Sequence, residues 1–308
     1  MIKPSFFVMG AQKAGTTTLH EWLCSQKVSL PEIKETHFFS SPEVYKRGYE
    51  WYAEQFSKNK DEKTFSIGEV DPDYMFFPDA SLRIKSMIDN PKIVIILREP
   101  LSRAYSHYLM TLRRGYETLS FSDALAVEEK RCLQSGFNLS HFSYIRRGLY
   151  LNQILALKKT FPSSLMLFVK YDDLFASSTS QLEFEKIGKF IGLNMSQAKL
   201  FQKKVNAAGK PRSVVLRDFI YKPSLLKKCL GALVPSRELK LRLALWADRF
   251  NTLETNDVRD PNWDSSVPIR FHELLLDECR KVGDVSGLNL DNWKNYHEQM
   301  ITRKKALE

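Results

Sequence analysis

Two glycines five residues apart, Gly10 and Gly15, enclose a short loop that can hold a phosphate group. A predicted strand precedes the loop and a predicted helix follows it, so backbone N–H groups at the start of that helix would point at a bound anion. In nucleoside triphosphatases a lysine follows the second glycine, whereas here Thr16 stands there and Lys13 lies inside the loop. The pattern predicts a site for a 5'-phosphate, with the cation close to the first bridging oxygen. The alternative is a tight strand-to-helix connection without a ligand.

A second cation, Arg98, directly follows the apolar run Lys92 to Leu97. A triphosphatase needs an acidic residue at the end of such a core strand to hold magnesium, and an arginine there favours an anion instead. Ser106, eight residues later on a predicted helix, would present its hydroxyl toward the Arg98 guanidinium, and together they would bind a phosphate monoester. Taken singly, each is more often an ordinary surface arginine or helix serine. Two phosphate sites fit a nucleotide that carries phosphate at both its 5' and 3' positions.

The elements that must position these residues alternate between strands and helices. Periodicity and turn residues predict strands at 5–9, 65–70, 92–97 and 165–171, and helices at 16–26, 102–114 and 150–161. The continuous apolar run at 92–97 is typical of a strand buried on both faces of a parallel sheet. Beyond residue 181 the pattern is mostly helical, at 181–192, 213–221, 238–250 and 268–282. We expect one domain over residues 1–308, with an α/β, three-layer, P-loop-type fold, a central parallel sheet flanked by helices, and a helical C-terminal part.

The composition is that of a globular protein with a surplus of positive charge. The formal net charge of +10 over 308 residues favours anionic partners such as a nucleotide or a sulfated glycan. The cysteines form no Cys-x-x-Cys pair, which argues against a zinc site and a disulfide framework; they are Cys24, Cys132, Cys229 and Cys279. No apolar run reaches the ~18 residues of a membrane span, and the apolar stretch near the N-terminus is too short for a signal peptide. We therefore expect reduced thiols and a cytoplasmic location.

Three motifs together resemble the sulfotransferases that use 3'-phosphoadenosine-5'-phosphosulfate (PAPS), in particular the heparan-sulfate type and its bacterial relatives. They are Gln12-Lys13-Ala14-Gly15-Thr16-Thr17-Thr18-Leu19, Arg98 with Ser106, and Glu35-Thr36-His37-Phe38-Phe39. The resemblance implies an enzyme that transfers a sulfuryl group from PAPS to a hydroxyl or amine of a glycan or small-molecule acceptor and releases adenosine 3',5'-bisphosphate, without a metal ion. It leaves the acceptor and the oligomeric state open, and it implies no nucleic-acid partner.

The resemblance also assigns the cofactor residues. Lys13 would stabilise charge on the bridging oxygen as adenosine 3',5'-bisphosphate leaves, and the residues that follow it would hold the 5'-phosphate: Ala14, Gly15, Thr16, Thr17 and Thr18. Arg98 and Ser106 would hold the 3'-phosphate. Lys210 and Arg212 stand where the family closes a basic loop over that same phosphate.

On the acceptor side, the resemblance makes Glu35 the base that activates the acceptor, with His37 as the alternative base or as a residue that orients the acceptor. Strand alternation would place Glu35, His37 and Phe39 on one face. Asp71 and Tyr74 are predicted to contact the substrate, although acids beside a proline are more often turn formers. Where glycan enzymes often show E-K-[ST]-P-x-Y, this chain has Glu69-Val70-Asp71-Pro72-Asp73-Tyr74, so Val70 replaces the lysine near the acceptor.

Two other functions use the same features. A P-loop kinase or nucleotidase would share the loop, and a non-enzymatic protein that binds polyanions would use the positive charge. The aromatic residues at 45, 49, 51, 52 and 56 fit either a platform for a sugar or the buried face of a helix, and the latter is the commoner arrangement.

Overall fold

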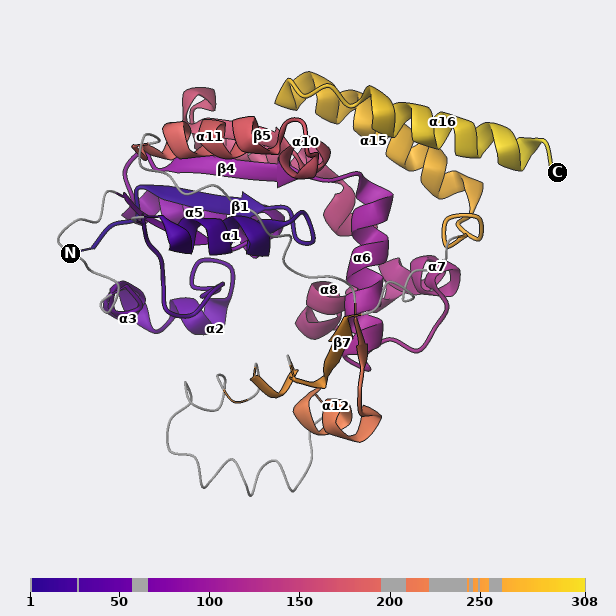
Figure 1. Cartoon of the computed structure of the whole chain (residues 1–308), viewed down its shortest axis with the longest axis horizontal. Coiled ribbons are helices and arrows are strands. Elements are labelled where there is room, and N and C mark those ends of the chain that lie inside the picture. The colour runs from indigo at the N-terminus through magenta and orange to yellow at the C-terminus, as the bar shows by residue number, and fades with distance from the viewer. Residues whose placement is uncertain are drawn as a thin grey trace. The chain divides into compact units, whose positions relative to one another are not determined.

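The computed structural model of the chain contains two compact units (Figure 1). The first comprises Met1–Arg103, Ile145–Asn206 and Ile269–Glu308, and the second comprises Ala104–Tyr144 and Ala207–Pro268. The residues that the structure describes are 2–26, 28–56, 66–194, 209–221, 243, 246–248, 250–254 and 262–307.

A parallel sheet of five strands forms the centre of the first unit. Its order is β2 (Val28–Ser29), β3 (Ser66–Val70), β1 (Phe6–Gly10), β4 (Lys92–Leu97) and β5 (Met166–Lys170). Every residue of β1 is buried, and so are the last five of β4, as expected for strands covered on both faces. Because the strands are parallel, the carboxyl ends of β1, β3 and β4 lie at one edge of the sheet, where each is followed by predicted site residues.

Helices flank this sheet, and they form two groups whose members contact one another. In the first group, α1 (Thr16–Ser25) packs against α11 (Ser180–Ile191), with the rings of Trp22 and Phe184 5.1 Å apart. In the second group, α9 contacts α5 and α15, and α15 pairs with α16; these helices are α5 (Pro78–Met87), α9 (Tyr150–Thr160), α15 (Ile269–Ser286) and α16 (Asp291–Lys305). Shorter helices complete the unit: α2 (Pro42–Tyr45), α3 (Gly48–Glu54), α4 (Asp73–Phe76) and α10 (Tyr171–Phe175).

The second unit is mostly helical. It takes up α6 (Pro100–Arg113), which begins in the first unit, and adds α7 (Phe121–Cys132), α8 (Gly136–Phe142) and α12 (Val214–Tyr221). Two short antiparallel strands, β6 (Gly209–Pro211) and β7 (Thr252–Glu254), belong to it as well.

A buried carboxylate, Glu117, anchors the loop between α6 and α7 of the second unit. Its Oε1 accepts the N–H groups of Thr118 and Leu119 at 2.9 and 3.0 Å. Its other oxygen accepts the Tyr144 hydroxyl at 2.9 Å and Arg131 Nη1 at 2.7 Å. Burial alone would raise the pKa of Glu117, but these backbone and side-chain donors outweigh it and the pKa is lowered.

The predicted fold class is confirmed, with a central parallel sheet and flanking helices. The four predicted strands are present, although β2 was missed because two residues carry no periodicity, and α6 begins at Pro100 instead of Ser102. The aromatic residues that we assigned to a buried helix face do pack in the core, where Tyr52 and Phe56 are fully buried. Most of the predicted helix 238–250 lies outside the described residues, and the single domain stays a prediction. Among the described helices, none has the length and apolar composition to cross a bilayer.

Candidate functional site

The loop between β1 and α1 has the conformation of an anion-binding turn. The Ala11 N–H donates to Ile96 O of β4 at 2.6 Å, and the Ala14 N–H donates to Ala11 O at 3.0 Å, which fixes the loop against the sheet. Lys13 and Gly15 both lie in the left-handed region, with φ of 70° and 82°. Gly15 immediately precedes α1, so the first N–H groups of that helix are directed toward the loop.

Gly15 is required here for two reasons. A side chain at φ 82° is strained, and an added Cβ would lie 2.3 Å from Cε2 of Phe175 in α10. Among the predicted phosphate residues, Lys13, Gly15 and Thr17 are partly exposed, whereas Ala14, Thr16 and Thr18 are buried. The buried members therefore shape the loop through their backbone and packing.

Arg98, at the end of β4, contacts the same loop. Its Nη1 donates to the Lys13 carbonyl oxygen at 2.9 Å, and its guanidinium lies 4.6 Å from the centre of the Tyr171 ring. A guanidinium has five N–H donors, so this hydrogen bond leaves capacity for a phosphate. Arg98 thus connects the loop to the end of the neighbouring strand.

The other residues predicted for the 3'-phosphate belong to the second unit. Ser106 is half-buried on α6. Arg212 is exposed and its guanidinium lies 5.5 Å from the Phe250 ring. Lys210 lies in β6, and its side chain is outside the described part of the chain. The site that these residues would form with Arg98 stays a prediction.

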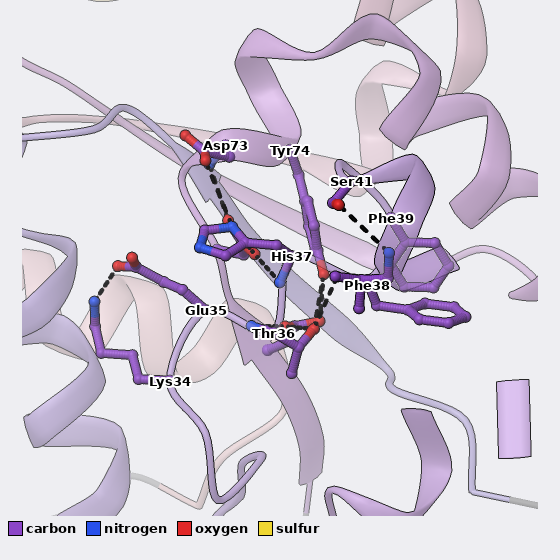
Figure 2. A network of polar contacts seen from close by, with 12 residues as sticks. Lys34, Glu35, Thr36, His37, Phe38, Phe39, Ser41, Asp73 and Tyr74 are labelled. Carbon is purple, nitrogen blue, oxygen red and sulfur yellow. Dashed lines mark hydrogen bonds and ion pairs between the residues drawn. The ribbon is translucent and has the colours of Figure 1, made fainter. Parts of the chain in front are cut away.

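The Glu35-Thr36-His37 segment is not a strand, so the expected alternation is wrong. Glu35 and His37 have left-handed backbones, with φ of 61° and 53°, and the segment forms bends and turns. The segment turns Glu35 and His37 to one side and Phe38 and Phe39 to the other (Figure 2). Phe39 is fully buried, with its ring 4.9 Å from Phe38 and 5.1 Å from Tyr52. The aromatic pair fixes the segment to the core, while the ionisable side chains remain partly exposed.

Glu35 lies beside the helix that follows the phosphate loop. Its carboxylate forms an ion pair with Lys34, and about 30% of its side chain is exposed. Burial and the Lys34 charge lower the pKa of His20 on α1 to about 4, with Glu35 opposing them. Lys34 and Glu35 therefore lie close enough to α1 for their charges to act on His20.

Two buried carboxylates, Glu69 near the end of β3 and Asp71 just after it, hold the segment in place. Glu69 is completely buried, and its Oε1 accepts the Thr36 N–H at 3.0 Å and the Thr36 hydroxyl at 2.6 Å. Its Oε2 accepts the hydroxyls of Tyr52 and Tyr74 at 2.8 and 2.9 Å. Burial and the neighbouring Asp71 raise the pKa of Glu69 to about 7, against these hydrogen bonds.

Asp71, also completely buried, is the second of these carboxylates. Its Oδ2 accepts the His37 N–H at 2.8 Å and lies 3.2 Å from His37 Nδ1. Burial would lower the pKa of His37, but the Asp71 carboxylate outweighs it and raises the pKa to about 10. His37 therefore carries a proton near neutral pH.

Asp73 completes this group. Its Oδ2 lies 3.5 Å from His37 Nδ1, and its Oδ1 accepts Nη1 of the buried Arg147 at 2.6 Å. His37, Asp71 and Asp73 could present three metal ligands within 4.8 Å of one another. Asp73 also pairs with Arg147, so the two carboxylates and the two basic side chains form one cluster of ion pairs.

Sequence reasoning found the residues of the phosphate loop and of the acceptor side, and it missed several residues that support them from behind. Tyr74, predicted to contact substrate, is fully buried with its hydroxyl on Glu69, and Asp71 contacts backbone and His37. The missed residues are Thr36, Tyr52, Glu69, Arg147, Tyr171 and Phe175. One of them, Glu69, could have been found from the sequence, because it lies near the end of a core strand.

A known family model covers the sheet, the phosphate loop and the segment beside it. The family model for the sulfotransferase domain matches residues 3–208, so the chain belongs to this family. The crystal structure of a sulfotransferase from Alicyclobacillus acidocaldarius has the same fold, with a TM-score of 0.66 at 19% identity, and the match covers 96% of this chain and 100% of that one.

The curated relatives include enzymes that act on heparan sulfate. Mouse heparan sulfate glucosamine 3-O-sulfotransferase 3B1 is 28% identical over 220 residues, which cover 68% of this chain and 54% of that protein. Human bifunctional heparan sulfate N-deacetylase/N-sulfotransferase 2 is 28% identical over 209 residues, covering 62% of this chain and 22% of that protein. The chain thus spans about half the length of the first of these relatives.

Proposed function

We propose that this chain transfers the sulfuryl group of PAPS to a hydroxyl or amine of a glycan or small-molecule acceptor and releases adenosine 3',5'-bisphosphate. The observation that carries the proposal is the loop between β1 and α1, with Lys13 ahead of an obligatory Gly15 at the start of the helix. Membership of the sulfotransferase family supports the reaction, and the names of the relatives support a glycan acceptor. We also propose that both units belong to one sulfotransferase domain.

The cofactor would lie across the ends of β1 and β4. The backbone N–H groups of Gly15 and Thr16 and the hydroxyl of Thr17 would hold the 5'-phosphate, with Lys13 near the bridging oxygen. Arg98 and Ser106, with Lys210 and Arg212 closing over them, would hold the 3'-phosphate. The charge-assisted hydrogen bond of an arginine to phosphate suits this position, because the planar fork of a guanidinium matches the geometry of phosphate oxygens.

The transfer itself would be an in-line displacement at sulfur. The acceptor oxygen forms a new bond to sulfur while the bond between sulfur and the bridging oxygen breaks, and its electron pair stays on the leaving 5'-phosphate. The acceptor hydroxyl proton passes to the Glu35 carboxylate. Lys13 stabilises the negative charge that grows on the bridging oxygen.

His37 has a different part in this scheme. Because its pKa is raised to about 10, it holds its proton at neutral pH and is unsuited to act as a base. We therefore assign the base to Glu35, and we assign to His37 the role of a fixed hydrogen-bond donor that orients the acceptor. Asp71 and Tyr74 support this side of the site from within the core.

Calorimetry with adenosine 3',5'-bisphosphate tests the cofactor first, and we expect tight binding that weakens markedly for adenosine 5'-phosphate. Incubation with ³⁵S-labelled PAPS and fractionated extract of the source cells then identifies the acceptor. Absence of binding and of label transfer would refute the proposed function. Strict dependence of activity on magnesium, tested with a chelator, would instead favour a P-loop kinase.

A further inference from the structure

The segment that carries Glu35 and His37 has a backbone that its sequence does not favour. Glu35 and His37, with one residue between them, both lie in the left-handed region that residues other than glycine rarely adopt. Thr36 lies between them, is 5% exposed, and points inward. Something in the core must therefore hold this backbone in place.

The hydrogen bonds of Glu69 divide this task between its two oxygens. Oε1 accepts both Thr36 donors, the N–H and the hydroxyl, and so holds the segment. Oε2 accepts Tyr52 from α3 and Tyr74 from α4, and so fixes the carboxylate itself. Four donors on two oxygens satisfy a buried carboxylate, so each lost donor loosens a defined part of the arrangement.

We infer that Glu69 is a positioning residue for sulfuryl transfer: through Thr36 it sets the backbone that presents Glu35 and His37 to the acceptor. This inference rests on the proposed function. Glu69 is itself completely buried, so it touches neither cofactor nor acceptor. Asp71 acts in parallel, because it follows the end of β3 two residues after Glu69 and accepts the His37 N–H.

The consequence is a selective defect. The loop from Gly10 to Gly15 is held by Ala11, Ile96 and Arg98, none of which contacts the Glu69 carboxylate among the hydrogen bonds of the described residues. A change at Glu69 should therefore leave the affinity for adenosine 3',5'-bisphosphate nearly unchanged. It should lower kcat, since a displacement of about 1 Å in a reacting group costs up to about 100-fold.

Two matched variants separate positioning from stability. Thr36→Val removes the hydroxyl that donates to Oε1 and that also contacts the Tyr74 hydroxyl and the Phe38 N–H. Tyr52→Phe removes one hydrogen bond to Oε2 of the same buried carboxylate. We expect Thr36→Val to lower the thermal stability at least as much as Tyr52→Phe. We expect Thr36→Val to lower kcat at least about 10-fold, and Tyr52→Phe to lower it no more than about threefold, because only the first loosens the segment directly.

Glu69→Gln is the direct variant, and Glu117→Gln is its control in the second unit, where a buried glutamate also accepts a tyrosine hydroxyl. Both lose a buried carboxylate, but we expect only Glu69→Gln to combine a loss in kcat of about 30-fold or more with a Kd for adenosine 3',5'-bisphosphate within about twofold. Hydrogen exchange should show faster exchange of the Thr36 N–H in Glu69→Gln only. If Glu69→Gln fails to fold, the comparison of kcat between Thr36→Val and Tyr52→Phe tests the inference instead.

The kcat assays use ³⁵S-PAPS and the extract fraction that supports transfer by the unsubstituted chain. Equal kcat in Thr36→Val and Tyr52→Phe, or in Glu69→Gln and Glu117→Gln, would overturn the inference. Unchanged protection of the Thr36 N–H in Glu69→Gln would also overturn it. Failure of the proposed function looks different, because the unsubstituted chain would then bind no adenosine 3',5'-bisphosphate and transfer no label.

Discussion

The ends of β1 and β3 lie side by side in the sheet, yet they use opposite chemistry to hold the segments beside them. β1 ends in a loop built from backbone N–H groups, a left-handed glycine and Lys13, with Arg98 beside it. Glu69 near the end of β3 and Asp71 just after it are buried and accept hydrogen bonds from the Glu35 segment. The comparison teaches that the end of β1 is rich in donors and cationic side chains, which suit an anion, whereas the acceptors that follow β3 bind donors of the protein itself. The first end is therefore suited to binding, and the second to support.

Substitution of Lys13 gives the largest expected effect at the β1 end. Lys13→Ala should lower the transfer rate by about 1000-fold or more, because it removes the cation nearest the bridging oxygen, while it retains much of the nucleotide affinity. Single-turnover transfer from ³⁵S-PAPS measures the rate. Lys3→Ala is the control and should leave the rate unchanged, because Lys3 precedes the opposite end of β1 and its exposed side chain pairs with the exposed Asp89. Full activity in Lys13→Ala would remove the lysine from the mechanism.

Substitution of Gly15 tests whether folding and nucleotide binding depend on the backbone conformation of the loop. Gly15→Ala should destabilise the fold by about 3 kcal/mol, from left-handed strain and the clash with Phe175, and it should abolish binding of adenosine 3',5'-bisphosphate. Gly48→Ala has almost the same φ, 83°, with open space around its Cβ, and should cost only about 1 kcal/mol. Denaturant unfolding measures both. Equal losses would mean that the Phe175 contact is unimportant.

Substitution of Arg98 tests whether the side chain that follows β4 binds the ligand or only holds the loop. If the guanidinium holds the 3'-phosphate, Arg98→Ala should weaken adenosine 3',5'-bisphosphate by about 30-fold and adenosine 5'-phosphosulfate, which lacks that phosphate, by only about threefold. Calorimetry with the two nucleotides measures the difference. Equal weakening would instead assign Arg98 to its hydrogen bond with the Lys13 carbonyl.

The smallest expected effect is a pH dependence that arises at the β3 end. Since burial and Asp71 raise the pKa of Glu69 from 4.5 to about 7, folded Glu69 holds a proton between these values that the unfolded chain releases. The stability contributed by Glu69 is thus fully present below about pH 4.5 and is lost as pH rises toward 7, by about 1.4 kcal/mol per pH unit at most. The difference in unfolding free energy between the unsubstituted chain and Glu69→Gln should fall over this range.

Glu117→Gln gives the opposite sign. The pKa of Glu117 is lowered, so its contribution is present above pH 4.5 and is lost below that value. Urea unfolding at a series of pH values measures both differences. A difference for Glu69→Gln that stays constant or rises with pH would show that the four donors keep Glu69 ionised.

The sequence predicted the strand ends well because they follow local rules. A buried strand reveals itself through a continuous apolar run, and two glycines around Lys13 reveal a loop that needs positive φ. The same rules failed at Glu35, where strand alternation was expected to place Glu35, His37 and Phe39 on one face. The left-handed turns there depend on Glu69, 34 residues away in the chain, and no local pattern reports that contact.

The sequence by itself determined the order of strands and helices, the loop around Lys13 and the cation after β4, because each depends on residues close together in the chain. Only the tertiary structure decided that Tyr74 and Asp71 lie inside the core, that His37 is held protonated, and that Thr36 is the buried anchor between two exposed residues. The physical reason is burial: the pKa and the hydrogen-bond partners of a polar group depend on which distant residues exclude water from it.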